Sequence, residues 1–195
     1  MSNIDKIYIL LNNIDLTYVV IVTNFEKIFI RNKTINMNTL GLDKQKAINL
    51  ANMLNDLLAN YQILYTNVRG FHWNVRGEKF FELHVKFEEL YDDLIIKIDE
   101  IAERILTLGY NPEYRYSAYL ENSTINESAQ TQDGIKDVEN IVESLSILIK
   151  KQRKILDASA EADDEGTNSL MSDYIREQEK LVWMYNAFLN KTNIN

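Results

Sequence analysis

Apolar residues recur at steps of three and four along four long segments of the chain, which is the period of an amphipathic helix. The stripes occupy residues 42–68, 83–105, 138–156 and 170–189. Continuing the first stripe places His72 on its apolar face. The pattern therefore predicts four long helices, each of which packs one face against the others.

The breaks between the stripes predict how the helices are connected. Gly77 separates the first two, and the second ends at Gly109 with a proline three residues later, a common helix stop. The connection over residues 113–130 is long and holds one short predicted helix at 117–122, whereas the polar stretch 159–168 separates the last two helices. One long connection between helices two and three is typical of an all-α, ferritin-like four-helix bundle.

The first 36 residues differ from the rest. Residues 16–23 are β-branched and aromatic, as in a buried strand, but no later segment offers a strand to pair with. We therefore divide the chain into an N-terminal appendage at 1–36 and a four-helix domain at 37–195. The appendage is interpreted as extra upstream sequence, with Met37 as the native start, or alternatively as a docking arm.

Composition narrows the function classes. The net charge of −8 argues against nucleic-acid binding by the whole surface, and the absence of cysteine excludes disulfides, thiolate metal sites and cysteine nucleophiles. No secretory leader is visible, and the longest apolar runs are far shorter than the ~20 residues of a spanning helix. We expect a soluble, cytoplasmic protein without a membrane association.

The two histidines and a set of carboxylates suggest metal chemistry. His84, Glu88, Asp99 and Glu103 fall within an arc of roughly 100° on one face of the second helix, beside the apolar stripe. His72 lies twelve residues before His84. The alternative interpretation is two ordinary pairs at four-residue spacing on a solvated edge, which the spacing alone does not exclude.

Helix geometry then predicts a site shared between two chains. His84 and Asp99 are about 22 Å apart along one helix, too far to bind one ion. If two copies of this helix cross antiparallel about a two-fold axis between residues 93 and 94, His84 faces Glu103 and Glu88 faces Asp99. Each site would take His72, His84 and Glu88 from one chain and Asp99 and Glu103 from the other. Imidazole with carboxylate suits iron, manganese or zinc.

These residues lie in motifs that resemble the Dps family, the mini-ferritins, over residues 40–190. The motifs are Phe71-His72-Trp73-Asn74-Val75-x-Gly77, Phe81-x-Leu83-His84-x-x-Phe87-Glu88-x-x-Tyr91, Asp99-x-x-Ala102-Glu103-Arg104 and Asp164-Glu165-Gly166-Thr167. The resemblance implies a hollow shell of twelve subunits built from two-fold dimers. Ferroxidase centres at the two-fold interfaces would oxidise ferrous ion, preferentially with hydrogen peroxide, and ferric mineral would be stored inside.

Carried over residue by residue, the resemblance makes His72, His84, Asp99 and Glu103 the iron ligands. Glu88 stands where several relatives have aspartate, so its mode of coordination is less defined. A classical ferritin centre needs Glu-x-x-His motifs inside one bundle, and Arg69 and Phe81 occupy the positions three before each histidine. An intrasubunit ferritin site is therefore excluded.

Three further features have two interpretations each. Trp73 either packs at a subunit interface or exchanges an electron with the site, and we favour packing. Arg104 is expected to pair with a nearby carboxylate rather than to touch substrate. The acidic run 163–165 either caps a helix or lines a cation pore, and we favour capping.

Two functional hypotheses follow from the sequence. The first is a ferroxidase and iron store that consumes peroxide and so counters oxidative stress. The second is a cage that coats DNA or docks a partner, with the metal site secondary. DNA binding has weak support, because the C-terminal segment 190–195 carries a single lysine and the densest basic run, 150–154, lies on a predicted helix.

Overall fold

The protein is described by a computed structural model over residues 36–129 and 132–191. Within these residues the chain forms five helices and no β-strand. The helices are α1 (Lys44–Asn74), α2 (Phe80–Thr107), α3 (Tyr116–Asn122), α4 (Gly134–Glu161) and α5 (Glu165–Phe188). Four of them are long, and the short α3 lies in the connection between α2 and α4, so the predicted all-α four-helix fold is confirmed.

The helix ends are set by local sequence. Asp43 begins α1, because its carboxylate accepts the backbone N–H groups of Gln45 at 2.9 Å and Lys46 at 3.0 Å. Asp133 caps α4 in the same way. At the other end of α2, Gly109 adopts a φ of +92°, a conformation that glycine reaches without a Cβ penalty.

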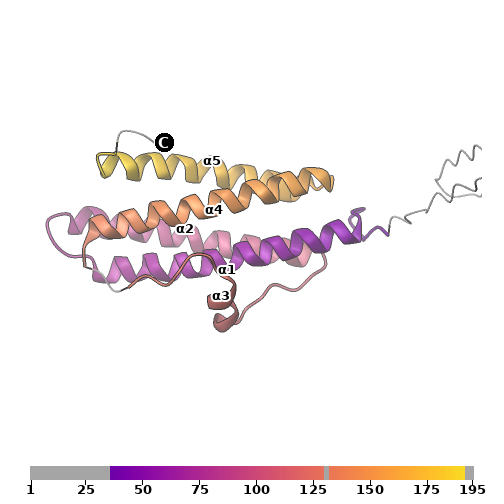
Figure 1. The fold of residues 1–195 in the computed structure, drawn as a ribbon, viewed down its shortest axis with the longest axis horizontal. Helices are drawn as coiled ribbons and strands as arrows, with labels where there is room; N and C mark the ends of the chain where they lie inside the picture. The colour runs from indigo at the N-terminus through magenta and orange to yellow at the C-terminus, as the bar shows by residue number, and fades with distance from the viewer. Residues whose placement is uncertain (1–35, 130–131, 192–195) are drawn as a thin grey trace, which may run out of the picture. The chain divides into compact units, whose positions relative to one another are not determined.

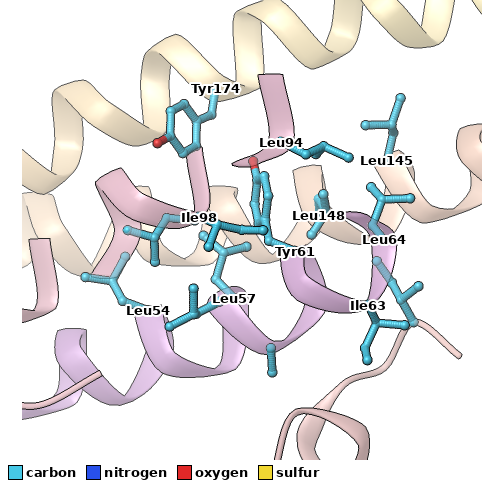
Figure 2. Packing of buried hydrophobic residues seen from close by; sticks show 14 of the residues in the cluster. Leu54, Leu57, Tyr61, Ile63, Leu64, Leu94, Ile98, Leu145, Leu148 and Tyr174 are labelled. Atoms are coloured by element: carbon cyan, nitrogen blue, oxygen red, sulfur yellow. The ribbon is translucent and has the colours of Figure 1, made fainter. Parts of the chain in front are cut away.

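The four long helices pack as two antiparallel pairs (Figure 1). Helix α1 packs against α2, and α4 packs against α5, while α1 also contacts α4 and the short α3. Because neighbours surround α1, its middle is buried on nearly every side. Figure 2 shows residues that fill this core, including Leu57, Tyr61 and Leu64 from α1 and Leu94 and Ile98 from α2.

One boundary differs from the sequence prediction. The polar stretch 159–168 was expected to break the pattern, but α4 continues to Glu161 and α5 begins at Glu165. Ser159 lies inside the helix, where its buried hydroxyl is satisfied because it donates to the carbonyl of Leu156 at 2.7 Å. The turn is short because the Asp164 side chain accepts the backbone N–H of Thr167 and starts the next helix at once.

The domain boundary after residue 36 stays a prediction. Residues 1–35, which include the β-branched segment at 16–23, lie outside the described residues, as does the end of the C-terminal segment. Among the helices that are described, none combines the length and apolar character needed to cross a lipid bilayer.

The centre of the bundle holds amides and phenols. The side-chain amides of Gln152 and Gln178 donate to the hydroxyl of Tyr61 at 2.8 Å and 2.5 Å, and burial raises the pKa of Tyr61. Tyr174 packs beside Tyr61 with ring centroids 6.1 Å apart and donates to Glu100 at 2.5 Å. These contacts satisfy phenol groups that would otherwise be costly to bury.

A buried carboxyl group near the start of α4 has no hydrogen-bond partner. Asp137 is fully buried, and neither of its side-chain oxygens is paired. Desolvation, together with the negative charge of Asp133, raises the pKa of Asp137 to about 7. The folded protein therefore retains a proton here that the unfolded chain releases near pH 4.

We expect the stability of the fold to decrease between about pH 4 and pH 7 through this group. The native state favours the protonated carboxyl, so each pH step above the ordinary pKa costs stability until the raised pKa is passed. Asp137→Asn should remove this contribution to the pH dependence of stability. At pH 8 the variant should be more stable than wild type by about 2–4 kcal/mol. Thermal unfolding of wild type and variant across this pH range measures the difference. Glu143→Gln, an exposed site on the same helix, is the control, and equal pH slopes for wild type and Asp137→Asn would contradict the assignment.

Candidate metal centre

The two histidines lie at the junction of the first helix pair and contact each other. His72 lies in the last turn of α1 and His84 in the first turns of α2. Their rings stack with centroids 3.8 Å apart and an interplanar angle of 20°. The Nδ1 atom of His72 lies 2.8 Å from the carbonyl oxygen of His84, and Nδ1 of His84 lies 2.9 Å from the carbonyl oxygen of His72. The turn around Gly77 brings the two helices together in this reciprocal arrangement.

These two hydrogen bonds determine the tautomer of both rings. A carbonyl oxygen only accepts, so each Nδ1 must carry the hydrogen and donate it. In a neutral imidazole the other nitrogen, Nε2, then carries no hydrogen and has a lone pair available for a cation. Backbone carbonyls that orient histidine rings are a common support for metal ligands. Both rings are therefore prepared to bind a cation through Nε2.

Glu88 completes a group of three. It lies one turn after His84 on α2, and the ligand atoms of His72, His84 and Glu88 all fall within 4.8 Å of one another. In the part of the chain that the structure describes, this is the one such group of three or more possible metal ligands. Its imidazole and carboxylate donors suit iron, manganese or zinc, and three ligands leave coordination positions open.

The other two predicted ligands lie elsewhere in the same subunit. Asp99 and Glu103 are exposed on α2, toward its C-terminal end, and neither joins the group formed by the histidines and Glu88. Their separation from His84, 15 and 19 residues along one helix, corresponds to about 22–28 Å. One subunit thus brings three of the five predicted residues together.

Aromatic side chains surround the histidines. The ring of Phe80 stacks on His84 with centroids 5.0 Å apart, and Tyr91 meets His72 edge-on at 5.3 Å. Partial burial, followed by the nearby carboxylates of Glu88 and Asp92, raises the pKa of Tyr91 above its ordinary value. The phenol therefore stays neutral at physiological pH.

Trp73 follows His72 in sequence but points to a different neighbour. Its ring packs on the guanidinium of Arg69 at 5.0 Å, and the same guanidinium lies 5.0 Å from the ring of Tyr65. The indole is largely exposed in the single subunit. An exposed tryptophan beside a metal group is compatible with packing at a subunit interface, the interpretation that we favoured.

A buried ion pair connects the last turn of α2 to the start of α5. Arg104 donates to Asp164 at 2.5 Å and to the hydroxyl of Thr167 at 2.9 Å. A Cβ at Gly166 would lie only 2.9 Å from the guanidinium, so a side chain there would displace it. The prediction that Arg104 pairs with a carboxylate is confirmed, and so is the capping role of Asp164. Its neighbours Asp163 and Glu165 are exposed.

Sequence reasoning missed the roles of Tyr91, Phe80 and Arg69. Tyr91 was visible only as part of a motif, although its position seven residues after His84 places it on the same helix face. The carbonyl partners of the two histidines carry no sequence signal, because they depend on how α1 and α2 meet.

Comparisons with known proteins agree with this architecture. Residues 51–194 match the family described as Ferritin-like domain. A DNA protection during starvation protein of Porphyromonas gingivalis is 43% identical, over 80% of this chain and 98% of that protein. The crystal structure of a Dps protein from Vibrio cholerae superposes with a TM-score of 0.78 and 54% identity, covering 82% of this chain and 99% of that one.

The chain belongs to the Dps family. An uncharacterized protein of Haemophilus influenzae, which is 51% identical over 78% of this chain and 96% of its own length, is a further relative. The Vibrio cholerae Dps protein is described as a member of a broad superfamily of ferritin-like diiron-carboxylate proteins. The histidine and carboxylate donors of the present Dps chain fit iron as the ion on which such a centre acts.

Proposed function

We propose that this Dps protein oxidises ferrous ion at centres shared between two subunits and stores the ferric product inside a hollow shell of twelve subunits. The observation that carries the proposal is the prepared half-site. Two imidazoles with free Nε2 atoms and one carboxylate converge, while two further carboxylates lie exposed on the same helix face. A second copy of the chain would supply those carboxylates.

The register of the two-fold arrangement supports this completion. With α2 helices crossing antiparallel between residues 93 and 94, Asp99 and Glu103 of the partner subunit face Glu88 and His84. The full centre would then comprise His72, His84, Glu88 and the two carboxylates of the partner. Open coordination positions admit ferrous ion and the oxidant, which we propose to be hydrogen peroxide.

Exposed apolar side chains fit the same register. Phe81 is 83% exposed and Leu106 is 55% exposed in the single subunit, and the two positions are symmetric about the same point on α2. Val85, which is 48% exposed, is symmetric with Ala102, which is partly buried. An apolar row of this kind is unfavourable in water and typical of a buried interface. The crossing that completes the centre would therefore also cover these side chains.

Paired electrons are the chemical advantage of such a centre. Reduction of one hydrogen peroxide molecule to two water molecules takes two electrons and two protons, and two ferrous ions supply the electrons. The residues of the completed centre would hold both ions close together, so that both electrons pass to the same peroxide molecule. Released one-electron products, such as hydroxyl radical, are thereby avoided.

Anaerobic loading with ferrous ion, followed by peroxide, tests this function. We expect the purified wild-type assembly to consume one peroxide for every two ferrous ions, with rapid growth of ferric absorbance and little spin-trapped hydroxyl radical. A protein that merely binds ferrous ion would oxidise it at the rate of buffer and with buffer's radical yield. That result would reject the proposed ferroxidase.

Binding of DNA has less support from the geometry. The Porphyromonas gingivalis relative is named for DNA protection. In the present chain, two cations of the densest basic run pair within the subunit, Lys151 with Asp56 and Arg153 with Glu179. Ion pairs of this kind reduce the charge available to phosphates. The metal centre is thus the function that the arrangement of side chains favours.

A further inference from the structure

The half-site raises a question of electron supply. The three converging ligands lie close enough to hold one ion. A single ferrous ion gives one electron, but splitting the O–O bond of peroxide into two water molecules takes two. Unless the second electron comes from elsewhere, the other product is hydroxyl radical. Hydroxyl radical would therefore form whenever a centre that holds only one ferrous ion meets peroxide.

One oxidisable ring contacts a ligand ring. Tyr91 meets His72 edge-on, with centroids 5.3 Å apart and an interplanar angle of 77°. Among the described residues, the other ring on the histidine pair is Phe80, which is far harder to oxidise than a phenol. Trp73 follows His72 in sequence but packs on Arg69. Tyr91 is thus the oxidisable ring that packs against a proposed iron ligand among the described residues.

Charge favours loss of an electron from Tyr91 rather than from its neighbour. The carboxylates of Glu88 and Asp92 act on Tyr91 more strongly than the cation of Arg69 does, and negative charge stabilises an oxidised ring. The next ring is Tyr65, whose centroid lies 6.2 Å from that of Tyr91. Its hydroxyl accepts a hydrogen bond from Arg69 at 3.3 Å, and the same cation lies over its ring. Positive charge makes Tyr65 harder to oxidise, so the oxidised state stays on Tyr91.

We propose that Tyr91 supplies the second electron when a centre holds one ferrous ion. This inference rests on the proposed ferroxidase function. The O–O bond of peroxide breaks, iron and Tyr91 each give one electron, and the phenol proton and one proton from solvent complete two water molecules. The products are ferric ion, water and a neutral tyrosyl radical. The next ferrous ion to arrive returns an electron, and solvent returns the proton, which restores Tyr91.

Electron paramagnetic resonance at low loading tests this role. Wild-type assembly with less than one ferrous ion per centre receives peroxide and is frozen within a second. We expect a tyrosyl signal that narrows when the protein contains ring-deuterated tyrosine. Tyr91→Phe keeps the ring against His72 but lacks an oxidisable phenol, so the signal should disappear and spin-trapped hydroxyl radical should rise severalfold. Tyr114→Phe, an exposed tyrosine distant in sequence from the histidines, should behave as wild type.

The outcomes separate the two proposals. If wild type fully loaded with ferrous ion reacts at the rate of buffer, the ferroxidase itself is wrong. If wild type reacts rapidly at full loading but Tyr91→Phe gives the same radical signals at low loading, Tyr91 is not the donor. Size-exclusion chromatography confirms that the variant assembles, so that loss of the signal is not due to unfolding.

Discussion

Two inactive variants of this chain should regain ferroxidase activity when they are assembled together. The first, His72→Gln/His84→Gln, loses the imidazole half of the proposed centre, and the second, Asp99→Asn/Glu103→Gln, loses the carboxylate half. Each alone is expected to oxidise iron near the uncatalysed rate. In a mixed two-fold dimer, one centre combines both defects, whereas the other combines two intact halves. Stopped-flow measurement of ferric absorbance detects the restored centre.

The size of the recovery follows from the symmetry. Random co-assembly makes half of the dimers mixed, and each mixed dimer has one intact centre of two, so about a quarter of wild-type activity is expected. Co-expression with two affinity tags yields the mixed assembly. In the matched control, the His72→Gln/His84→Gln chain is co-assembled with a Glu88→Gln chain. Both variants damage the same half of the centre, so no intact centre forms and this mixture should stay inactive. If the first mixture also stays inactive, the ligands are not shared in the proposed register.

The fold could be predicted from the sequence to a large extent, because it depends on patterns that are local. Helical periodicity placed four long helices, and the short helix expected at 117–122 begins one residue earlier, at Tyr116. The end of α4 could not be predicted from polarity. Polar residues of the segment 159–168 are satisfied inside the structure, and Asp164 is buried by an arginine 60 residues away. A run of polar residues therefore predicts a break in a helix only when its side chains are hydrogen-bonded to water and not to other parts of the protein.

The ligand residues of the candidate site could be predicted from the sequence, but the contacts that orient their side chains could not. Spacing placed His84 and Glu88 on one helix face, and the short turn after α1 brings His72 beside them. The carbonyl partners that fix both tautomers depend on the exact meeting of α1 and α2, which no spacing specifies. Tyr91 illustrates the same limit, since its contact with His72 crosses between helices. Tertiary contacts of this kind decide reactivity, and sequence patterns decide only which residues are available for it.

Replacement of Arg104, at the junction of α2 and α5, should cost more stability than replacement of Arg153, which pairs between α4 and α5. Arg104→Ala leaves Asp164, whose side chain is 2% exposed, without its ion-pair partner. Removing one partner of a buried ion pair costs about 3–5 kcal/mol. Thr167 still donates two hydrogen bonds to the Asp164 carboxylate, so we expect a loss at the lower end, about 3 kcal/mol. For a chain of this length the melting temperature should decrease by roughly 6–12 °C.

The matched control is Arg153→Ala, which breaks an ion pair with Glu179 whose side chains are both half exposed. Exposed pairs contribute about 0–1 kcal/mol, so its melting temperature should change little. Adding Asp164→Asn to Arg104→Ala should recover part of the loss, because Asn keeps the helix cap but carries no charge to leave unpaired. Equal decreases for the two arginine variants would show that burial does not strengthen the Arg104 pair. A confirmed difference would show that the buried Arg104–Asp164 pair contributes more stability than the exposed Arg153–Glu179 pair, and Arg104 lies next to Glu103 on α2.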